Sequence, residues 1–232
     1  MVAMTKTILR PNRDELKNIW LFIACGEGAI LEIRALWPKG ISGKKPSKIK
    51  HFKTANYESV DQCKIAFEDA VLELNEEGYN IYTVMNPIRE DFLCIGGAKD
   101  ADIRYRDLLL IDIDRSGNTS APANQTELDA ANTLANEIRS YLTDREWPEP
   151  ITVLSGNGYH LYYILNELPN NEIFDELVCR TLNNLATKFN NSIVSVDTTV
   201  YNASRITKVP GTIMRKGDES FDRPYRMAVV LS

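Results

Sequence analysis

Residues 151–165 read ITVLSGNGYHLYYIL, and this stretch decides the fold. Two apolar runs, rich in β-branched and aromatic residues, flank a short turn that contains two glycines. This pattern predicts a β-hairpin, whose two strands run antiparallel. A hairpin at this place argues against a doubly wound parallel sheet, because the strands of such a sheet are joined by crossover helices.

Amphipathic helices are predicted on both sides of the hairpin. Residues 126–143, with Thr126 as the expected cap, and residues 171–189 carry apolar side chains at helical spacing. Upstream of both, residues 104–114 (RYRDLLLIDID) predict a strand. This order predicts an α+β fold with mixed or antiparallel sheets, in which helices pack on one face and the other face stays free.

Further elements are expected on either side of this centre. Helices are predicted near residues 12–20 and at 59–77, where Ser59 is a candidate N-cap. Strands are expected at residues 20–25, 29–36 and 80–87, and in the tail at 192–200, 204–209 and 223–231.

The bulk composition is that of a globular protein. The chain has 232 residues, of which 44% are hydrophobic and 25% charged. A net charge of −5 argues against a protein that coats DNA through its overall charge. Residues 38–53 nevertheless hold six lysines and no acid. This segment is either a solvated loop or an arm that contacts phosphates.

Compartment and cysteine usage give a simple expectation. No apolar run approaches the about 20 residues that span a bilayer, and the N-terminal residues lack the apolar core of a secretory signal. The four cysteines are far apart and form no CxxC pair: Cys25, Cys63, Cys94 and Cys179. We therefore expect a cytoplasmic protein with reduced thiols, no membrane partner and no structural zinc.

Two aspartates interrupt the end of the strand at residues 104–114. Asp112 and Asp114 are two residues apart, so both face one side, while Ile111 and Ile113 face the helices. An unpaired buried charge is very costly. A solvated strand end, a structural salt bridge and a bound cation all remain open, and Mg²⁺ or Mn²⁺ would suit the hard carboxylate oxygens.

Residues 155–160, SGNGYH, form a second candidate group. Gly156 and Gly158 permit positive φ angles and close backbone approach, and backbone N–H groups in such a turn can cradle an anion. His160 follows on the outgoing strand and could donate to a phosphate. The alternatives are a hairpin turn without a ligand and a structural histidine.

Residues 195–212, SVDTTVYNASRITKVPGT, form the third group. Asp197 is another carboxylate in a strand-like context. Arg205 and Lys208 could bind phosphate oxygens, although each alone could be an ordinary surface charge. Together the three groups supply carboxylates for divalent cations and donors for phosphate, which are the parts of a nucleotidyl-transfer site.

In this order and at this spacing, LLLIDID, SGNGYHLYY and VDTTVYNASRITKVPGT resemble the catalytic domain of archaeo-eukaryotic primases. The resemblance runs from about residue 29 to residue 230 and is closest to the primase–polymerases of plasmids, phages and other mobile elements. It implies one two-lobed catalytic domain over residues 1–232. Residues 1–100 would form an N-terminal α/β lobe, and residues 101–232 an RRM-like palm.

The resemblance also implies an activity and a site. The activity is that of a DNA primase–polymerase, which transfers nucleotides from NTPs or dNTPs to a 3′-hydroxyl by a two-metal mechanism with Mg²⁺ or Mn²⁺. Asp112, Asp114 and Asp197 would be the catalytic metal ligands. The nucleotide would be bound by Ser155, Gly156, Gly158, His160, Arg205 and Lys208, with His160 on the triphosphate.

The implied partners are a single-stranded or primed DNA template and nucleoside triphosphates, with further domains or a helicase in many members of the family. Primer extension is the safer expectation than initiation from two free nucleotides. Two other hypotheses stay open. One is a non-catalytic RRM-like module that stacks bases on tyrosines such as Tyr162. The other is a different metal-dependent enzyme with a DxD motif, such as a nuclease.

Overall fold

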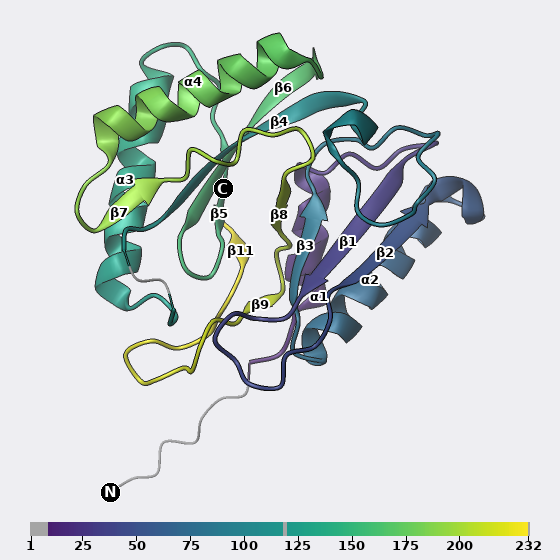
Figure 1. Ribbon diagram of the computed structural model, residues 1–232, viewed down its shortest axis with the longest axis horizontal. Helices are drawn as coiled ribbons and strands as arrows, with labels where there is room; N and C mark the ends of the chain where they lie inside the picture. Colours follow the sequence, from purple (N-terminus) through teal and green to yellow (C-terminus); the bar gives the residue numbers. More distant parts are fainter. Residues whose placement is uncertain (1–8, 118–119, 232) are drawn as a thin grey trace, which may run out of the picture.

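The computed structural model describes residues 9–117 and 120–231 and contains two main antiparallel sheets (Figure 1). The first sheet has four strands in the order β2-β1-β3-β8. They are β1 (Ile30–Leu36), β2 (Lys48–Lys53), β3 (Asn80–Val84) and β8 (Ile206–Lys208). The helix α2 (Val60–Glu76) packs against β1, β2 and β3.

The second sheet has five strands in the order β11-β5-β6-β4-β7. They are β4 (Tyr105–Arg115), β5 (Ile151–Leu154), β6 (Tyr159–Pro169), β7 (Val194–Val196) and β11 (Val229–Val230). The helices α3 (Gln125–Thr143) and α4 (Glu172–Phe189) cover one face of this sheet (Figure 1). The hairpin is β5–β6, as predicted, and the α+β class with helices on one face is confirmed.

Helix caps explain where the long helices begin. Ser59 Oγ accepts the backbone N–H of Gln62, so α2 begins as predicted. The helix α3 begins one residue before the prediction. Its cap is Asn124 and not Thr126, because Asn124 Oδ1 accepts the N–H of Glu127 while the Glu127 carboxylate accepts the N–H of Asn124.

Two segments differ from the prediction. The expected strand at residues 20–25 is instead the end of a 3₁₀ helix, η1 (Lys17–Leu21), which follows α1 (Arg13–Leu16), and then a turn. Its apolar side chains mark burial and not strand pairing, since Phe22 and Ile23 are both in the core. The lysine-rich segment is only partly a loop, because its last six residues form β2.

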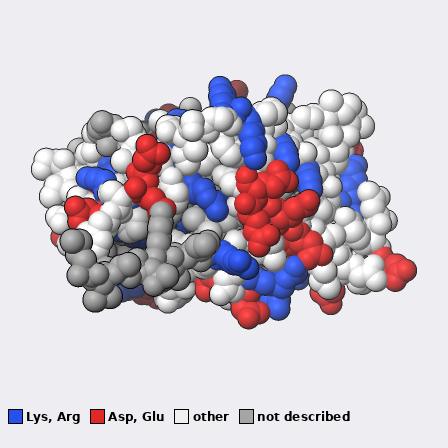
Figure 2. Space-filling model, turned by 90° about the horizontal axis from the view of Figure 1, so that it is seen from below, with Lys and Arg blue, Asp and Glu red and all other residues white. Residues whose placement is uncertain are grey.

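Several lysines of residues 38–53 are held by local acceptors. Lys48 Nζ lies 2.6 Å from a Glu77 carboxylate oxygen, and Lys50 Nζ lies 3.5 Å from Glu73. Figure 2 shows, on the face seen from below, a patch of acidic side chains with basic side chains around it. Lys39 instead lines a cleft between the two sheets.

The remaining elements are short. They are η2 (Thr54–Asn56), η3 (Asp100–Asp102), β9 (Ile213–Met214) and β10 (Arg226–Met227). Two of them, β9 and β10, form a separate two-stranded sheet. One continuous core reaches both sheets, and Phe22 stacks on Tyr162 with ring centroids 4.6 Å apart. The strand β8 returns from the C-terminal part of the chain to the first sheet, so residues 206–208 pair with β3. The division into lobes at residue 100 stays a prediction.

Within the described residues, no helix is long and apolar enough to cross a membrane.

Candidate active site

A cleft of about 480 Å³ opens between the two sheets. Its walls come from β1, β3 and β8 on one side and from β4 and β6 on the other. Seven of the predicted site residues line it: Asp112, Asp114, Ser155, His160, Asp197, Arg205 and Lys208. Gly156 and Gly158 lie in the turn that joins β5 and β6, next to the lining residues Ser155 and Asn157.

The alternation of β4 places two carboxylates in this cleft. Ile111 and Ile113 are fully buried on the other face of the strand, whereas Asp112 and Asp114 are half-buried and line the cleft. Burial, and after it the neighbouring charge of Asp112, raises the pKa of Asp114. The Arg115 backbone N–H donates to Asp114 Oδ1 over 2.8 Å, which partly offsets this effect.

Three candidate site residues lie side by side on neighbouring segments of the chain: Asp112, His160 and Asp197. Asp112 on β4 pairs with His160 on β6, and the Asp197 N–H donates to the Asp112 carbonyl over 2.8 Å. The Asp197 carboxylate accepts the N–H of Thr199. Among residues 9–117 and 120–231, no three His, Cys, Asp or Glu side chains converge as a ready metal-ligand group. The three aspartates therefore line the same cleft, but their carboxylates do not converge on one position.

Two buried hydroxyl groups hold the His160 ring on the side of Nδ1. Its Nδ1 lies 2.8 Å from the Tyr162 hydroxyl, which in turn contacts the Thr207 hydroxyl on β8. Its Nε2 lies 3.4 Å from Asp112 Oδ1 at the edge of the cleft. Because His160 is only 6% exposed, this arrangement fixes its ring and directs Nε2 toward the carboxylate.

The glycine turn approaches β4 so closely that a side chain would not fit at its centre. A Cβ atom on Gly158 would lie 2.1 Å from the Ile113 carbonyl oxygen. Gly156 has a φ of 105°, which favours glycine. The Gly158 carbonyl accepts the Ser155 backbone N–H and hydroxyl, over 2.9 and 3.1 Å. The turn is thus closed on itself and seated against the strand that carries the aspartates.

Basic side chains form the opposite wall. Lys208 is 2% exposed, and its Nζ has one hydrogen bond, a 3.5 Å contact to the Ile213 carbonyl. Burial, assisted by the nearby Arg215 charge, lowers the pKa of Lys208 well below its ordinary value. Burial also lowers the pKa values of Arg215 and Lys216. Among the described residues, no carboxylate lies within ion-pair distance of Lys208 or Lys216.

Arg205 lies in the cleft but is partly engaged by the chain itself. Its guanidinium donates to the Thr199 carbonyl, close to Asp197 in the sequence. Its buried Nε has no partner among the described residues. The Arg205 side chain therefore lies along residues 197–205, between Asp197 and β8.

Several residues that line the cleft were not predicted from the sequence. Arg215 and Lys216 follow the Pro210–Gly211 turn as a basic pair, which is a visible signal in IMRKGD. The sequence predicts only a turn residue at Asn157, whereas the side chain is buried and lines the cleft. The position of Tyr82 in the cleft has no local sequence signal, because it depends on the pairing of β3 with β8.

No protein-family model matches the sequence, and no curated protein sequence matches it. Solved structures do match. The archaeo-eukaryotic primase domain of the cyanophage S-2L primase–polymerase has a TM-score of 0.55 at 17% identity, covering 97% of this chain and 91% of that one. Primase RepB′ has a TM-score of 0.53 at 12% identity, covering 95% of this chain and 56% of that one.

A third match is the polymerase domain of ligase D from Mycobacterium tuberculosis, solved in complex with DNA. Its TM-score is 0.51 at 13% identity, and the alignment covers 92% of this chain and 78% of that one. At such low identity these likenesses concern the fold. The chain has the fold of archaeo-eukaryotic primase–polymerase catalytic domains, as the sequence motifs predicted.

Proposed function

We propose that the protein is a primase–polymerase that transfers a nucleotide from a nucleoside triphosphate to a 3′-hydroxyl on a DNA template. One observation carries this proposal: a pair of carboxylates faces, across a single cleft, basic side chains that have no carboxylate partner among the described residues. A metal–triphosphate complex would complement both walls at once, because its cations suit the aspartates and its phosphates suit the lysines and arginines.

The donor set fits Mg²⁺ or Mn²⁺. Asp112 and Asp114 present hard oxygen ligands on one face of β4, and Asp197 lines the same cleft. Burial and the charge of Asp112 raise the pKa of Asp114, and a bound cation would favour its charged form. When bound there, two such cations would supply positive charge to the attacking and leaving oxygens. Asp112, Asp114 and Asp197 are the residues that would hold them.

The basic wall would hold the triphosphate. Lys208 is a buried amino group with no carboxylate partner among the described residues, and an anionic ligand would favour its charged form. Arg215 and Lys216 extend this wall, and Arg205 could turn its partly free guanidinium toward the same phosphates. His160, already fixed by Tyr162, would donate from Nε2 beside Asp112.

The aromatic side chains do not favour the non-catalytic binding module. Tyr162 is fully buried, stacked on Phe22 and hydrogen-bonded to His160. Tyr163 is 1% exposed and packs against Trp147. An RRM-type platform needs such rings on its open surface, where bases can stack on them. In this chain they belong to the core.

Primer extension tests the proposal directly. The protein should incorporate nucleotides on a primed DNA template with Mg²⁺ or Mn²⁺, and Asp112→Asn should reduce incorporation at least about 1,000-fold, because a metal ligand is lost. Asp144→Asn, at an exposed carboxylate at the end of α3, is the matched control and should keep full activity. NTPs and dNTPs are assayed separately, with and without a primer.

Two results would contradict the proposal. Degradation of DNA without incorporation would indicate a nuclease. Metal-independent binding without synthesis, unaffected by Asp112→Asn, would indicate a binding module.

A further inference from the structure

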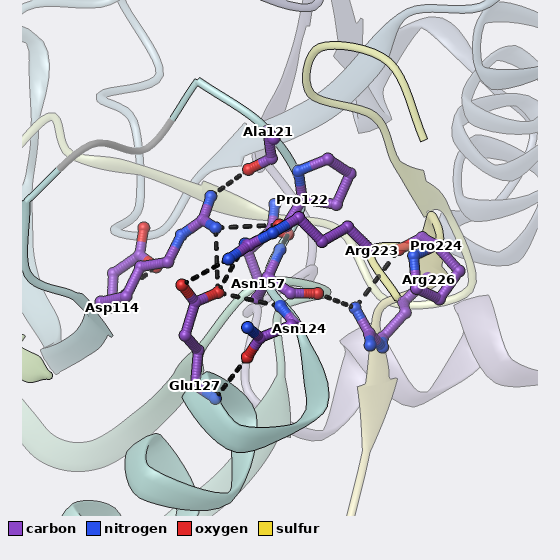
Figure 3. Close-up of polar contacts among 11 residues, drawn as sticks. Asp114, Ala121, Pro122, Asn124, Glu127, Asn157, Arg223, Pro224 and Arg226 are labelled. Carbon is purple, nitrogen blue, oxygen red and sulfur yellow. Dashed lines mark hydrogen bonds and ion pairs between the residues drawn. The ribbon is translucent and has the colours of Figure 1, made fainter. Parts of the chain in front are cut away.

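The loop at residues 120–124 is held by three arginines, one at the end of β4 and two in the C-terminal segment (Figure 3). It leads from β4 to α3, and three consecutive backbone carbonyls in it each accept from a guanidinium group. Ala121 and Pro122 accept from Arg115, at the end of β4. Pro122 also accepts from Arg223 over 2.7 Å, and Ala123 accepts from Arg226 over the same distance.

Glu127 is the carboxylate that holds this group of arginines together. One of its oxygens lies 3.1 Å from Arg115 Nη1, and both lie within hydrogen-bond distance of Arg223, at 2.8 and 3.0 Å. The same carboxylate accepts the Asn124 N–H over 2.8 Å. Burial alone would raise the pKa of Glu127, but these donors lower it to about 2. Glu127 therefore stays charged across the whole physiological pH range.

The loop touches the candidate active site at two points. Asn157, inside the glycine turn, accepts the Ala123 N–H at its Oδ1 over 2.9 Å. Arg115 is the direct neighbour of Asp114, and its backbone N–H donates to the Asp114 carboxylate. Its own side chain is 2% exposed, so its direction is fixed by the loop carbonyls and Glu127. Figure 3 shows the Arg223 side chain between Pro122 of the loop and Glu127, with Asn157 and Asp114 nearby.

We propose that Glu127 is a positioning residue, which sets the glycine turn and Asp114 relative to each other through Arg115, Arg223 and the loop at 120–124. Glu127 does not line the cleft and does not touch its contents. Its effect passes through contacts that fix the glycine turn and the end of β4, which both belong to one wall of the site. This inference rests on the proposed nucleotidyl transfer for its kinetic consequence, whereas its structural consequence can be measured without it.

The kinetic test uses Glu127→Gln, which keeps an oxygen that can accept the Asn124 N–H but removes the charge. We expect kcat for nucleotide incorporation to fall about 10–100-fold, since small displacements of reacting groups have effects of this size. The KM for the nucleotide should change much less, because Lys208 and Arg215 lie outside the network. The matched control is Glu68→Gln, a buried carboxylate bound to Arg13 and Trp20 far from the cleft.

Arg223→Ala provides a second variant, because its side chain is 31% exposed and its loss leaves the core intact. If both residues act through one network, the double variant should lose about as much activity as the more impaired single variant. Wild-type kcat in Glu127→Gln, additive losses in the double variant, or an equal loss in Glu68→Gln would each overturn the inference.

Amide hydrogen exchange separates this inference from the proposed function. Exchange at residues 155–160 should be at least about tenfold faster in Glu127→Gln than in wild type, and unchanged in Glu68→Gln. Unchanged exchange in Glu127→Gln would overturn the positioning role even if the wild-type protein incorporates nucleotides. A wild-type protein without any incorporation would instead contradict the proposed function, and the exchange result would still decide the positioning role.

Discussion

The charge of Asp114 is costly in the folded chain without a cation, and we expect its removal to stabilise the protein. Its folded-state pKa is raised by burial and by Asp112, so the folded state holds the proton more tightly than the unfolded state does. Stability is therefore lost as pH rises through that raised pKa. Asp114→Asn should increase the free energy of unfolding at pH 7 by on the order of 1 kcal/mol, about 2–4 °C in Tm.

Thermal unfolding in chelator at several pH values measures this effect. The advantage of Asn over Asp should vanish below the unfolded-state pKa of an aspartate and should shrink when Mn²⁺ is added to the wild type. Asp144→Asn should show neither trend, since Asp144 is exposed. A lower Tm for Asp114→Asn at pH 7 in chelator would contradict the prediction.

Lys208 should take up a proton when a nucleotide binds. Burial lowers its pKa in the free protein, and a bound triphosphate would favour the charged form again. Nucleotide affinity should therefore weaken as pH rises. Lys208→Met should reduce affinity about 10–100-fold, the equivalent of a hydrogen bond to a charged group of about 1.5–3 kcal/mol.

Isothermal titration calorimetry in buffers of different ionisation enthalpy counts the protons taken up. Lys208→Met should reduce the uptake, and Lys216, whose pKa is also lowered by burial, would account for a remainder. Lys188→Met, at an exposed position on α4, is the matched control. Equal proton uptake in wild type and Lys208→Met would show that Lys208 does not meet the triphosphate.

At the scale of elements, the β5–β6 hairpin depends on the absence of a side chain at Gly158. A methyl group there would meet the Ile113 carbonyl at 2.1 Å and would push the turn away from β4. Gly158→Ala should cost about 1–3 kcal/mol of stability, as overpacking does, and should also reduce incorporation. Gly26→Ala is the control, because a Cβ atom at Gly26 meets nothing within 4 Å. Equal urea midpoints for the two variants would contradict this prediction.

Local patterns predicted those elements whose signals are complete within a few residues. The helix α2 has its Ser59 cap and a periodic apolar face, and the hairpin has two apolar runs around a glycine turn. The segment at residues 20–25 failed because burial of Phe22 and Ile23 produces the same apolar run as a strand. Propensity alone could not separate the two cases.

The candidate site divides in the same way. Strand alternation placed Asp112 and Asp114 on the open face of β4, and the structure shows both in the cleft. The burial of Lys208 and its lack of a carboxylate partner could not be predicted, because both follow from the pairing of β8 with β3 across more than 100 residues of sequence. Glu127 carried a visible capping signal, but its contacts with Arg223 depend on the C-terminal chain.

At the scale of the whole molecule, we expect the two sheets to unfold together. One core cluster contains residues of both sheets, and the Phe22–Tyr162 stack connects the N-terminal segment to β6. Phe22→Ala should cost about 3–5 kcal/mol, because a buried ring is replaced by a cavity. This loss should reach both sheets equally, although Phe22 lies before the first of their strands.

Two single-tryptophan reporters test this coupling by urea unfolding, one keeping Trp37 beside the first sheet and the other keeping Trp147 beside the second. Phe22→Ala should lower the midpoint equally in both reporters. Phe189→Ala is the control for a loss of stability that begins beside the second sheet, because it removes an aromatic contact between α4 and α3. Its smaller decrease in the urea midpoint should likewise appear in both reporters. A shift of the Trp37 midpoint without a shift of the Trp147 midpoint would show that the two sheets unfold separately. In that case, the orientation of His160 through Tyr162 would not depend on the N-terminal segment.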